Sequence, residues 1–154
     1  MKIAVTGGGP GGLYFSILTK KAIPDCQIDV YERNKSDDSF GFGVVFSDET
    51  LSEFLARDPE SYDLIRSKFA YWDELDVARD GEIVRITGNG FCGCSRKTLL
   101  QLLQQRCTEE GVNLHFEHNV DDLSQLDAET QWAKKLYAIK SLAVLGNGRR
   151  AGAR

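Results

Sequence analysis

Residues 3–12 have the sequence Ile-Ala-Val-Thr-Gly-Gly-Gly-Pro-Gly-Gly, and this stretch decides the fold. It holds a G-x-G-x-x-G pattern directly after a short apolar run, and the glycines of the pattern are Gly7, Gly9 and Gly12. A helical pattern over 11–22 follows, and then a second apolar run over 27–32 that ends at Glu32. This order of strand, glycine turn, helix, strand and acid is the fingerprint of a dinucleotide-binding βαβ unit.

Each residue of the fingerprint has a chemical task. Gly7 permits the tight turn, Gly9 lets a pyrophosphate approach the backbone, and Gly12 allows close packing of helix and strand. The phosphates would lie at the helix N-terminus, where free N–H groups and the helix dipole favour an anion. Glu32 can accept hydrogen bonds from a ribose diol and disfavours a 2′-phosphate, which predicts FAD or NAD. The alternative is a glycine turn that merely connects a strand to a helix.

Composition and charge exclude several classes of protein. The 154 residues have the length of one domain, and the net charge of -4, without a basic cluster before the C-terminal tail, argues against nucleic-acid binding. No apolar run approaches the ~18 residues of a membrane span, and no secretory signal pattern is present. We therefore expect a cytoplasmic protein without a membrane segment.

The cysteines and histidines give no sign of a metal site. Cys92 and Cys94 are the one close cysteine pair, and neither a C-x-x-C motif nor a second pair accompanies them. We interpret all four cysteines as reduced structural thiols. His115 and His118 lie in a strand-like segment and are interpreted as surface or edge residues.

The rest of the chain predicts an interruption of the sheet after the second strand. We expect a long connection over 33–47, helices from 48 to about 56 and over 59–68, a hairpin of strands 69–78 and 82–87, a flexible glycine-rich link over 88–94, a helix over 96–110 and a strand over 112–116. The fold class is therefore α/β, a Rossmann-like FAD/NAD(P)-binding domain with an inserted helical and hairpin segment. We place this domain at 1–126, followed by a divergent C-terminal segment at 127–154 that we expect to be the least ordered part.

The sequence resembles the class A flavoprotein monooxygenases, which are single-component aromatic hydroxylases with a p-hydroxybenzoate-hydroxylase-like fold. It is most similar to the branch of salicylyl-CoA hydroxylase and aminobenzoyl-CoA monooxygenase, and similar also to the violacein-pathway hydroxylases. The stretches that carry the resemblance are 1–15, Val30-Tyr-Glu-Arg-Asn, Phe40-Gly-Phe-Gly-Val-Val-Phe-Ser-Asp-Glu-Thr-Leu, Phe69-Ala-Tyr-Trp-Asp and Arg96-Lys-Thr-Leu-Leu. The segment that begins at Gly41 is the most specific of them.

The resemblance implies a set of FAD-binding residues. Gly7, Gly8, Gly9, Pro10, Gly11 and Gly12 would hold the pyrophosphate, Glu32 the adenosine ribose, and Arg33 the adenine side. The loop over 41–46, with Gly43 and Val44, would pass beside the flavin, Arg96 would reach the ribose or pyrophosphate, and Val120 would lie near the adenine. Alternatively, both arginines are surface residues, and Phe40, Phe42 and Phe46 are core residues.

The resemblance also implies the activity, which is hydroxylation of an aromatic acid or its CoA thioester with NAD(P)H and O₂. No catalytic residue and no metal ligand is assigned. Members of this family are much longer, and from about Asp127 the sequence loses their character, as a truncation, a frameshift or a decayed gene copy would produce. Two alternatives are a free-standing NAD or FAD module and one half of a split flavoenzyme with a companion chain.

Overall fold

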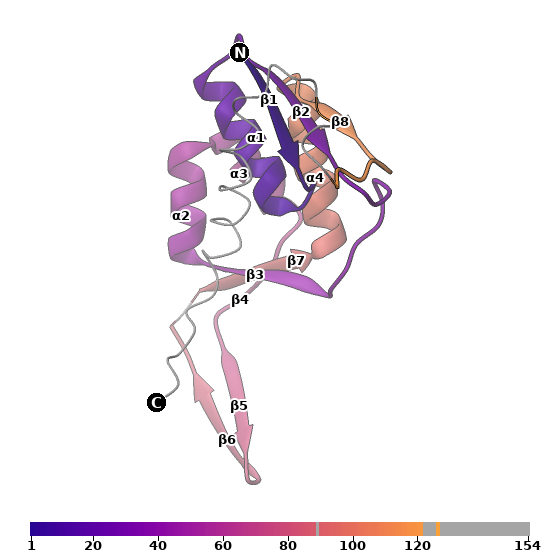
Figure 1. Cartoon of the computed structure of the whole chain (residues 1–154). Coiled ribbons are helices and arrows are strands. Elements are labelled where there is room, and N and C mark those ends of the chain that lie inside the picture. The colour runs from indigo at the N-terminus through magenta and orange to yellow at the C-terminus, as the bar shows by residue number, and fades with distance from the viewer. Residues whose placement is uncertain (89, 122–125, 127–154) are drawn as a thin grey trace, which may run out of the picture. The chain divides into compact units, whose positions relative to one another are not determined.

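The computed structural model describes residues 1–88, 90–121 and 126, and the chain divides into two compact units (Figure 1). Unit 1 consists of Met1–Asp38 and Leu103–Arg154, and unit 2 is the intervening segment Ser39–Leu102. The expected divergent segment 127–154 lies outside the described residues, so its boundary at residue 126 remains a prediction. Among the described residues, no helix has the length and apolar character needed to cross a membrane.

Unit 1 contains a three-stranded parallel sheet of order β1-β2-β8, with bounds β1 Lys2–Thr6, β2 Gln27–Tyr31 and β8 Asn113–His115. Helix α1, Pro10–Ala22, connects the first two strands, which pair in register from Lys2 with Gln27 to Thr6 with Tyr31. Strand β8 then adds to β2 with Val30 opposite Leu114. The predicted βαβ unit and the Rossmann-like fold class are therefore confirmed.

Alternating burial in the strands builds the core of unit 1. In both β1 and β2 the second and fourth residues are buried, which is the period-2 pattern of a strand with one covered face. Helix α1 adds one apolar side, and helix α4, Arg96–Glu109, adds its C-terminal half. The buried side chains of this core are Ile3, Val5, Leu13, Ile17, Cys26, Ile28, Val30, Leu103, Cys107, Val112 and Leu126.

Unit 2 holds an antiparallel sheet of order β3-β7-β4, with bounds β3 Gly43–Ser47, β7 Phe91–Ser95 and β4 Ala70–Trp72. Two helices lie between these strands in sequence, α2 Asp48–Arg57 and α3 Pro59–Arg66. Ser47 caps α2 by accepting the Thr50 N–H, and Asp58 caps α3 by accepting the Ser61 N–H, so the predicted helix starts are confirmed. A separate hairpin joins β5, Leu75–Arg79, to β6, Glu82–Ile86.

The structure corrects three sequence predictions in unit 2. The segment 88–94, predicted as a flexible link, forms most of the central strand β7. The connection predicted over 33–47 contains strand β3. The single strand predicted over 69–78 is instead two strands, β4 and β5, which belong to different sheets. Packing explains β7. A Cβ on Gly93 would lie 2.9 Å from the Val44 carbonyl oxygen and 3.2 Å from the Trp72 ring, so the glycine permits close approach within a strand.

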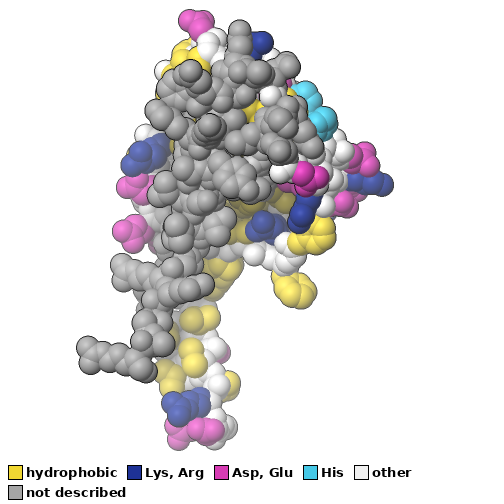
Figure 2. All heavy atoms as spheres, in the orientation of Figure 1, with side chains coloured by type: hydrophobic (Ala, Val, Ile, Leu, Met, Phe, Trp, Pro, Cys, Tyr) yellow, Lys and Arg dark blue, Asp and Glu magenta, His cyan; other side chains and the backbone are white. Residues whose placement is uncertain are grey.

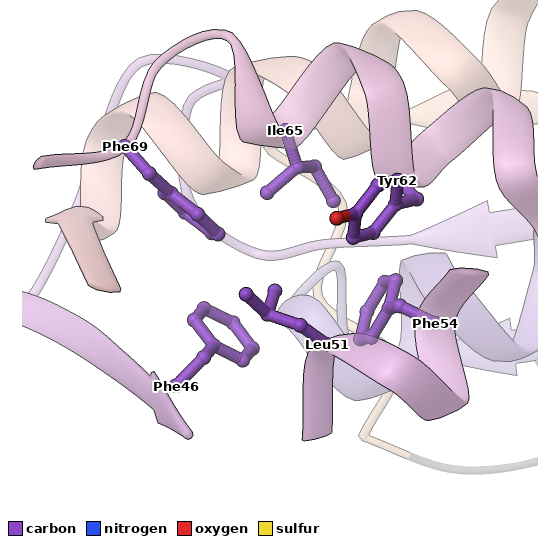
Figure 3. Close-up of a pocket in the computed structure, with 6 residues that line it drawn as sticks. All are labelled: Phe46, Leu51, Phe54, Tyr62, Ile65 and Phe69. Carbon is purple, nitrogen blue, oxygen red and sulfur yellow. The ribbon is translucent and has the colours of Figure 1, made fainter. Parts of the chain in front are cut away.

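An apolar cluster fills the space between β3 and the two helices of unit 2 (Figure 3). Phe46 stacks on Phe69 with ring centroids 5.3 Å apart and meets Phe54 edge to face at 6.1 Å. The other residues around this small pocket are Leu51, Tyr62 and Ile65. Phe46 is thus half-buried within this cluster, whereas Phe40 and Phe42 are exposed.

Candidate dinucleotide-binding site

The glycine turn of unit 1 has the strained geometry that its sequence predicts. Gly7 has φ +104°, a conformation that residues with a side chain rarely adopt, and its N–H donates to the Tyr31 carbonyl over 2.8 Å. This bond ties the end of β1 to the end of β2. A Cβ on Gly12 would overlap the Gly7 carbonyl oxygen, so glycine is required for the close contact of turn and helix.

Helix α1 begins with unused hydrogen-bond donors. Gly9 is the N-cap and Pro10 the first helical residue, no side chain caps this end, and no acidic residue lies in the first turn. A Cβ placed on Gly9 would have no heavy atom of the described residues within 4 Å, so these residues leave open space beside the backbone. The N–H groups of the first turn and the positive end of the helix dipole therefore favour an anion at this position.

Glu32 follows β2 and reaches across to the turn. Its Oε2 accepts the Gly8 N–H over 2.8 Å, and its Oε1 accepts the backbone and side-chain N–H groups of Asn34 at 2.9 and 2.6 Å. A Cβ on Gly8 would lie only 2.9 Å from the Cβ of Glu32, so Gly8 also has to be glycine. A carboxylate has about four acceptor positions, and three are occupied, so one remains for a further donor.

Asn34 is a functional candidate that the sequence analysis missed, since a polar residue after an acid carries no recognisable signal. Arg33 between them is exposed. The backbone of 115–118 is bonded to this segment, because Glu32 N donates to His115 O at 2.8 Å and His118 N donates to Glu32 O at 2.9 Å. The half-buried Val120 follows this segment two residues later.

The histidines form a cluster at strand β8, which lies at one edge of the described sheet. The His115 ring stacks on Tyr31 at 4.8 Å, and its Nε2 lies 2.9 Å from the Asp29 carboxylate. His118 meets the same tyrosine at 5.2 Å in a tilted arrangement. His115 thus lies in an edge strand, and the exposed His118 lies beyond its end, which agrees with the interpretation of the two as surface or edge residues.

Unit 2 brings the remaining predicted residues together. Gly43 pairs with Ser95 and Val44 with Cys94 across β3 and β7, and Arg96 begins α4 immediately afterwards. The Arg96 N–H donates to the Phe42 carbonyl at 3.4 Å, and a Cβ on Gly41 would contact the Arg96 side chain at 3.7 Å. The half-buried Arg96 side chain thus lies beside the glycine-rich loop that precedes β3.

The thiols give no sign of reactivity. All four cysteines are free, and burial raises the pKa of the Cys92 and Cys94 thiols and raises that of Cys107 to about 12. A raised pKa keeps a thiol protonated and inert at neutral pH. Among the residues that the structure describes, no cluster of metal-ligating side chains is present.

Comparison with known proteins places this site in context. The chain is 46% identical over 127 residues to a salicyloyl-CoA 5-hydroxylase of Streptomyces, and this match covers 82% of the chain and 25% of that protein. It is 34% identical over 122 residues to the 3-hydroxy-4-methyl-anthranilyl-[aryl-carrier protein] 5-monooxygenase of Streptosporangium sibiricum, and this match covers 79% of the chain and 34% of that protein. It is also 31% identical over 152 residues to the protodeoxyviolaceinate monooxygenase of Chromobacterium violaceum, and this match covers 96% of the chain and 38% of that protein. No family model matches.

Solved structures agree on the fold. A 2-methyl-3-hydroxypyridine-5-carboxylic acid oxygenase superimposes with a TM-score of 0.65 at 18% identity, covering 75% of this chain and 31% of the other. PqsL of P. aeruginosa superimposes with a TM-score of 0.63 at 18% identity, covering 76% and 33%. The glycine turn and the βαβ sheet therefore define a Rossmann-like nucleotide-binding fold of the kind found in flavoprotein hydroxylases.

The resemblance to the class A aromatic monooxygenases is confirmed by the named relatives, and the chain is homologous to one part of such enzymes. It spans 25% to 38% of the length of these three proteins.

Proposed function

We propose that this chain binds FAD and forms the FAD-binding part, residues 1–126, of a monooxygenase that hydroxylates aromatic acids or their CoA thioesters. The observation that carries the proposal is the uncapped start of α1, with open space at Gly9 and the Glu32 carboxylate bonded to the adjoining Gly8. These features fit a dinucleotide with two phosphates and a ribose diol. The relatives named for salicyloyl-CoA and an anthranilyl carrier-protein thioester support an aromatic thioester as substrate.

The chain's own residues would bind and orient the cofactor. Gly7 to Gly12 would hold the pyrophosphate through backbone N–H groups, and Glu32 would accept a ribose hydroxyl at its remaining acceptor position. Arg33 and Val120 would border the adenine, and Asn34 would hold the Glu32 carboxylate in place. In unit 2, the resemblance implies flavin contacts for Gly43, Val44 and Arg96.

When bound, FAD would supply the redox chemistry, with NAD(P)H as electron donor and O₂ as oxygen source. The chain contributes no assigned acid or base, so its role is to bind, to position and to exclude water. We further propose that the remaining part of the enzyme, carried by a longer or companion chain, provides the substrate pocket, and that the protein works in the cytoplasm, where its thiols stay reduced.

The proposal is tested by mixing the purified chain with FAD and separating bound from free flavin by gel filtration. We expect flavin absorbance to elute with the protein. The competing function is an NAD-binding module without oxygen chemistry, which the Rossmann-like sheet alone would equally allow. A chain that retains no flavin but responds to an NAD titration would establish that alternative and refute ours.

A further inference from the structure

The Glu32 carboxylate is held in one orientation by two neighbours in unit 1. Its Oε1 accepts both the backbone and the side-chain N–H of Asn34, at 2.9 and 2.6 Å, and its Oε2 accepts the Gly8 N–H over 2.8 Å. A carboxylate oxygen has about two acceptor positions, so Asn34 fills those of Oε1, and the residues that the structure describes leave one position on Oε2. The open position therefore belongs to the oxygen that lies against the glycine turn.

The Asn34 backbone is itself anchored on its other side. Its carbonyl accepts the Glu117 N–H over 3.1 Å, while the Glu32 carbonyl accepts the His118 N–H over 2.9 Å. Glu117 has φ +55°, a left-handed conformation that residues other than glycine seldom adopt. Strain of this kind persists only where the surrounding structure imposes it, and it clusters at binding and active sites.

Burial does not account for this anchoring. Glu117 and His118 are exposed, Glu32 and Asn34 are half-buried, and Figure 2 shows histidine side chains at the surface beside strand β8. The hydrogen bonds, and not an apolar core, thus fix the place of the Asn34 side chain.

We propose that Asn34 is a positioning residue that sets the specificity of the adenosine site for an unsubstituted ribose hydroxyl. This inference rests on the proposed function, since it concerns the site that would bind the adenosine of FAD. With Oε1 filled by Asn34, Glu32 offers one position to one hydroxyl donor, and its charge stays fixed where a ribose 2′-phosphate would have to lie. Without Asn34, Oε1 regains free acceptor positions and the Glu32 side chain regains rotamers, so water competes with the hydroxyl and the discrimination weakens.

A purely local role for Asn34 explains less. An asparagine after a strand can form a turn, because its side chain readily bonds to nearby backbone groups. Here the side-chain N–H donates instead to the Glu32 carboxylate, a charge-assisted bond that a turn does not require. The identity of the acceptor therefore favours positioning of the acid over local turn formation.

The first test compares the Kd for FAD with the Kd for the FAD analogue that carries 2′-deoxyadenosine. We expect the parent chain to bind the analogue at least about tenfold more weakly, because one hydrogen bond to the Glu32 carboxylate is lost, whereas in Asn34→Ala this ratio should fall below about threefold. Asn113→Ala is the matched control, since it removes a 3.0 Å amide bond to the Asp29 carboxylate in the same sheet and should keep the parent ratio. An Asn34→Ala variant that keeps the parent ratio would overturn the proposal.

A double-mutant cycle separates positioning from general stabilisation. Asn34→Ala should raise the Kd for FAD at least about fivefold in the parent but less than about twofold in a Glu32→Ala background, because Asn34 acts through the carboxylate. Equal effects in the two backgrounds would contradict this role. Asn34→Asp keeps the side-chain volume and removes the donor, so it should lower the ratio between the two flavin ligands as Asn34→Ala does; a ratio like that of the parent would show that volume alone matters.

Hydrogen exchange at the Gly8 amide tests the positioning without any ligand. Asn34→Ala should speed this exchange at least about tenfold, since the carboxylate that accepts this N–H is no longer held, and Asn113→Ala should change it less than about threefold. Equal exchange in the two variants would refute the positioning role.

The same measurements distinguish this proposal from the proposed function. A parent chain that binds NAD in place of flavin would refute the proposed function alone, because both molecules carry the adenosine ribose and the comparison is then made with NAD and its 2′-deoxyadenosine analogue. A chain that binds FAD with the same ratio in the parent and in Asn34→Ala would count against the specificity role alone. A parent chain that binds neither dinucleotide would overturn both.

Discussion

Replacing Gly12 by alanine gives the sharpest test of the turn geometry. The new Cβ would overlap the Gly7 carbonyl oxygen and would lie 3.3 Å from its carbonyl carbon and 3.4 Å from Val5 Cγ1. The obstructing oxygen is backbone, and the N–H of the same peptide group, that of Gly8, donates to Glu32 Oε2 over 2.8 Å, so this peptide resists rotation. Because the clash is with a fixed backbone atom, we expect the loss of folding stability from overpacking to reach about 3 kcal/mol or more.

Part of that cost is offset. Alanine is favoured over glycine within a helix by about 1 kcal/mol, so the net loss should be at least about 2 kcal/mol. For a chain of this size each kcal/mol lowers Tm by about 2–4 °C, which predicts a fall of about 4–8 °C. Thermal melting followed by near-ultraviolet circular dichroism measures it directly.

Gly9→Ala is the matched control, because it adds the same methyl group in open space. Its backbone φ of -74° suits any residue, and no heavy atom of the part of the chain that the structure describes lies within 4 Å of the new Cβ, so Tm should stay within about 2 °C. The methyl group would occupy the space beside the first turn of α1, so the Kd for FAD, measured by flavin fluorescence, should rise at least about tenfold. A Gly12→Ala variant that melts like the parent would refute the packing argument, and a Gly9→Ala variant with the parent Kd would refute the phosphate site.

Further outcomes test other parts of the molecule. Glu32→Ala should weaken FAD binding by about 1.5–3 kcal/mol in a titration, because a charge-assisted hydrogen bond is lost; unchanged affinity would make Glu32 a purely structural acid. Leu13→Ala should lower the free energy of unfolding by about 2–5 kcal/mol in denaturant titrations, since the side chain is fully buried, and a loss below 1 kcal/mol would contradict that packing. Burial raises the Cys107 pKa from 9.0 to about 12, so as the pH rises the thiol loses its proton in the unfolded state before it does so in the folded state. The free energy of unfolding should therefore fall by about 1.4 kcal/mol for each unit by which the pH rises between these two values, and a Cys107→Ala variant should lack this decrease. The chain alone, given FAD and NAD(P)H, should form no hydroxylated product from a salicyloyl thioester by chromatography, and stoichiometric product would show that it is self-sufficient.

Local signals explain what the sequence predicted well. The βαβ unit is predictable because glycines, an apolar run and an acid at fixed spacing leave few alternatives, and Ser47 marks the start of α2 through chemistry within one turn. Helix α4 carried enough apolar residues to be recognised from its period alone.

Tertiary contacts explain what the sequence did not predict. Gly93 looked like a loop residue, and only its neighbours across the sheet, Val44 and Trp72, reveal why a strand needs glycine there. The bonds from Asn34 to Glu32 depend on a side-chain orientation that residue order does not specify. The functional assignments of Arg33, Arg96 and Val120 remain predictions, because they depend on a molecule that has to be bound before they can be tested.

The discontinuity of unit 1 has a consequence for how the chain reaches its native state. The bond between Asn113 and Asp29 spans 84 positions, and that between Cys107 and Leu13 spans 94, so the sheet and its covering helix close late during synthesis. Contacts of such long range slow folding, because chain entropy is lost before they form. The closure entropy grows only slowly with length, by about 0.6 kcal/mol per doubling. The segment Ser39–Leu102 could therefore change in size over evolution with little thermodynamic effect on the nucleotide-binding sheet, provided that it folds quickly enough to bring its two ends together.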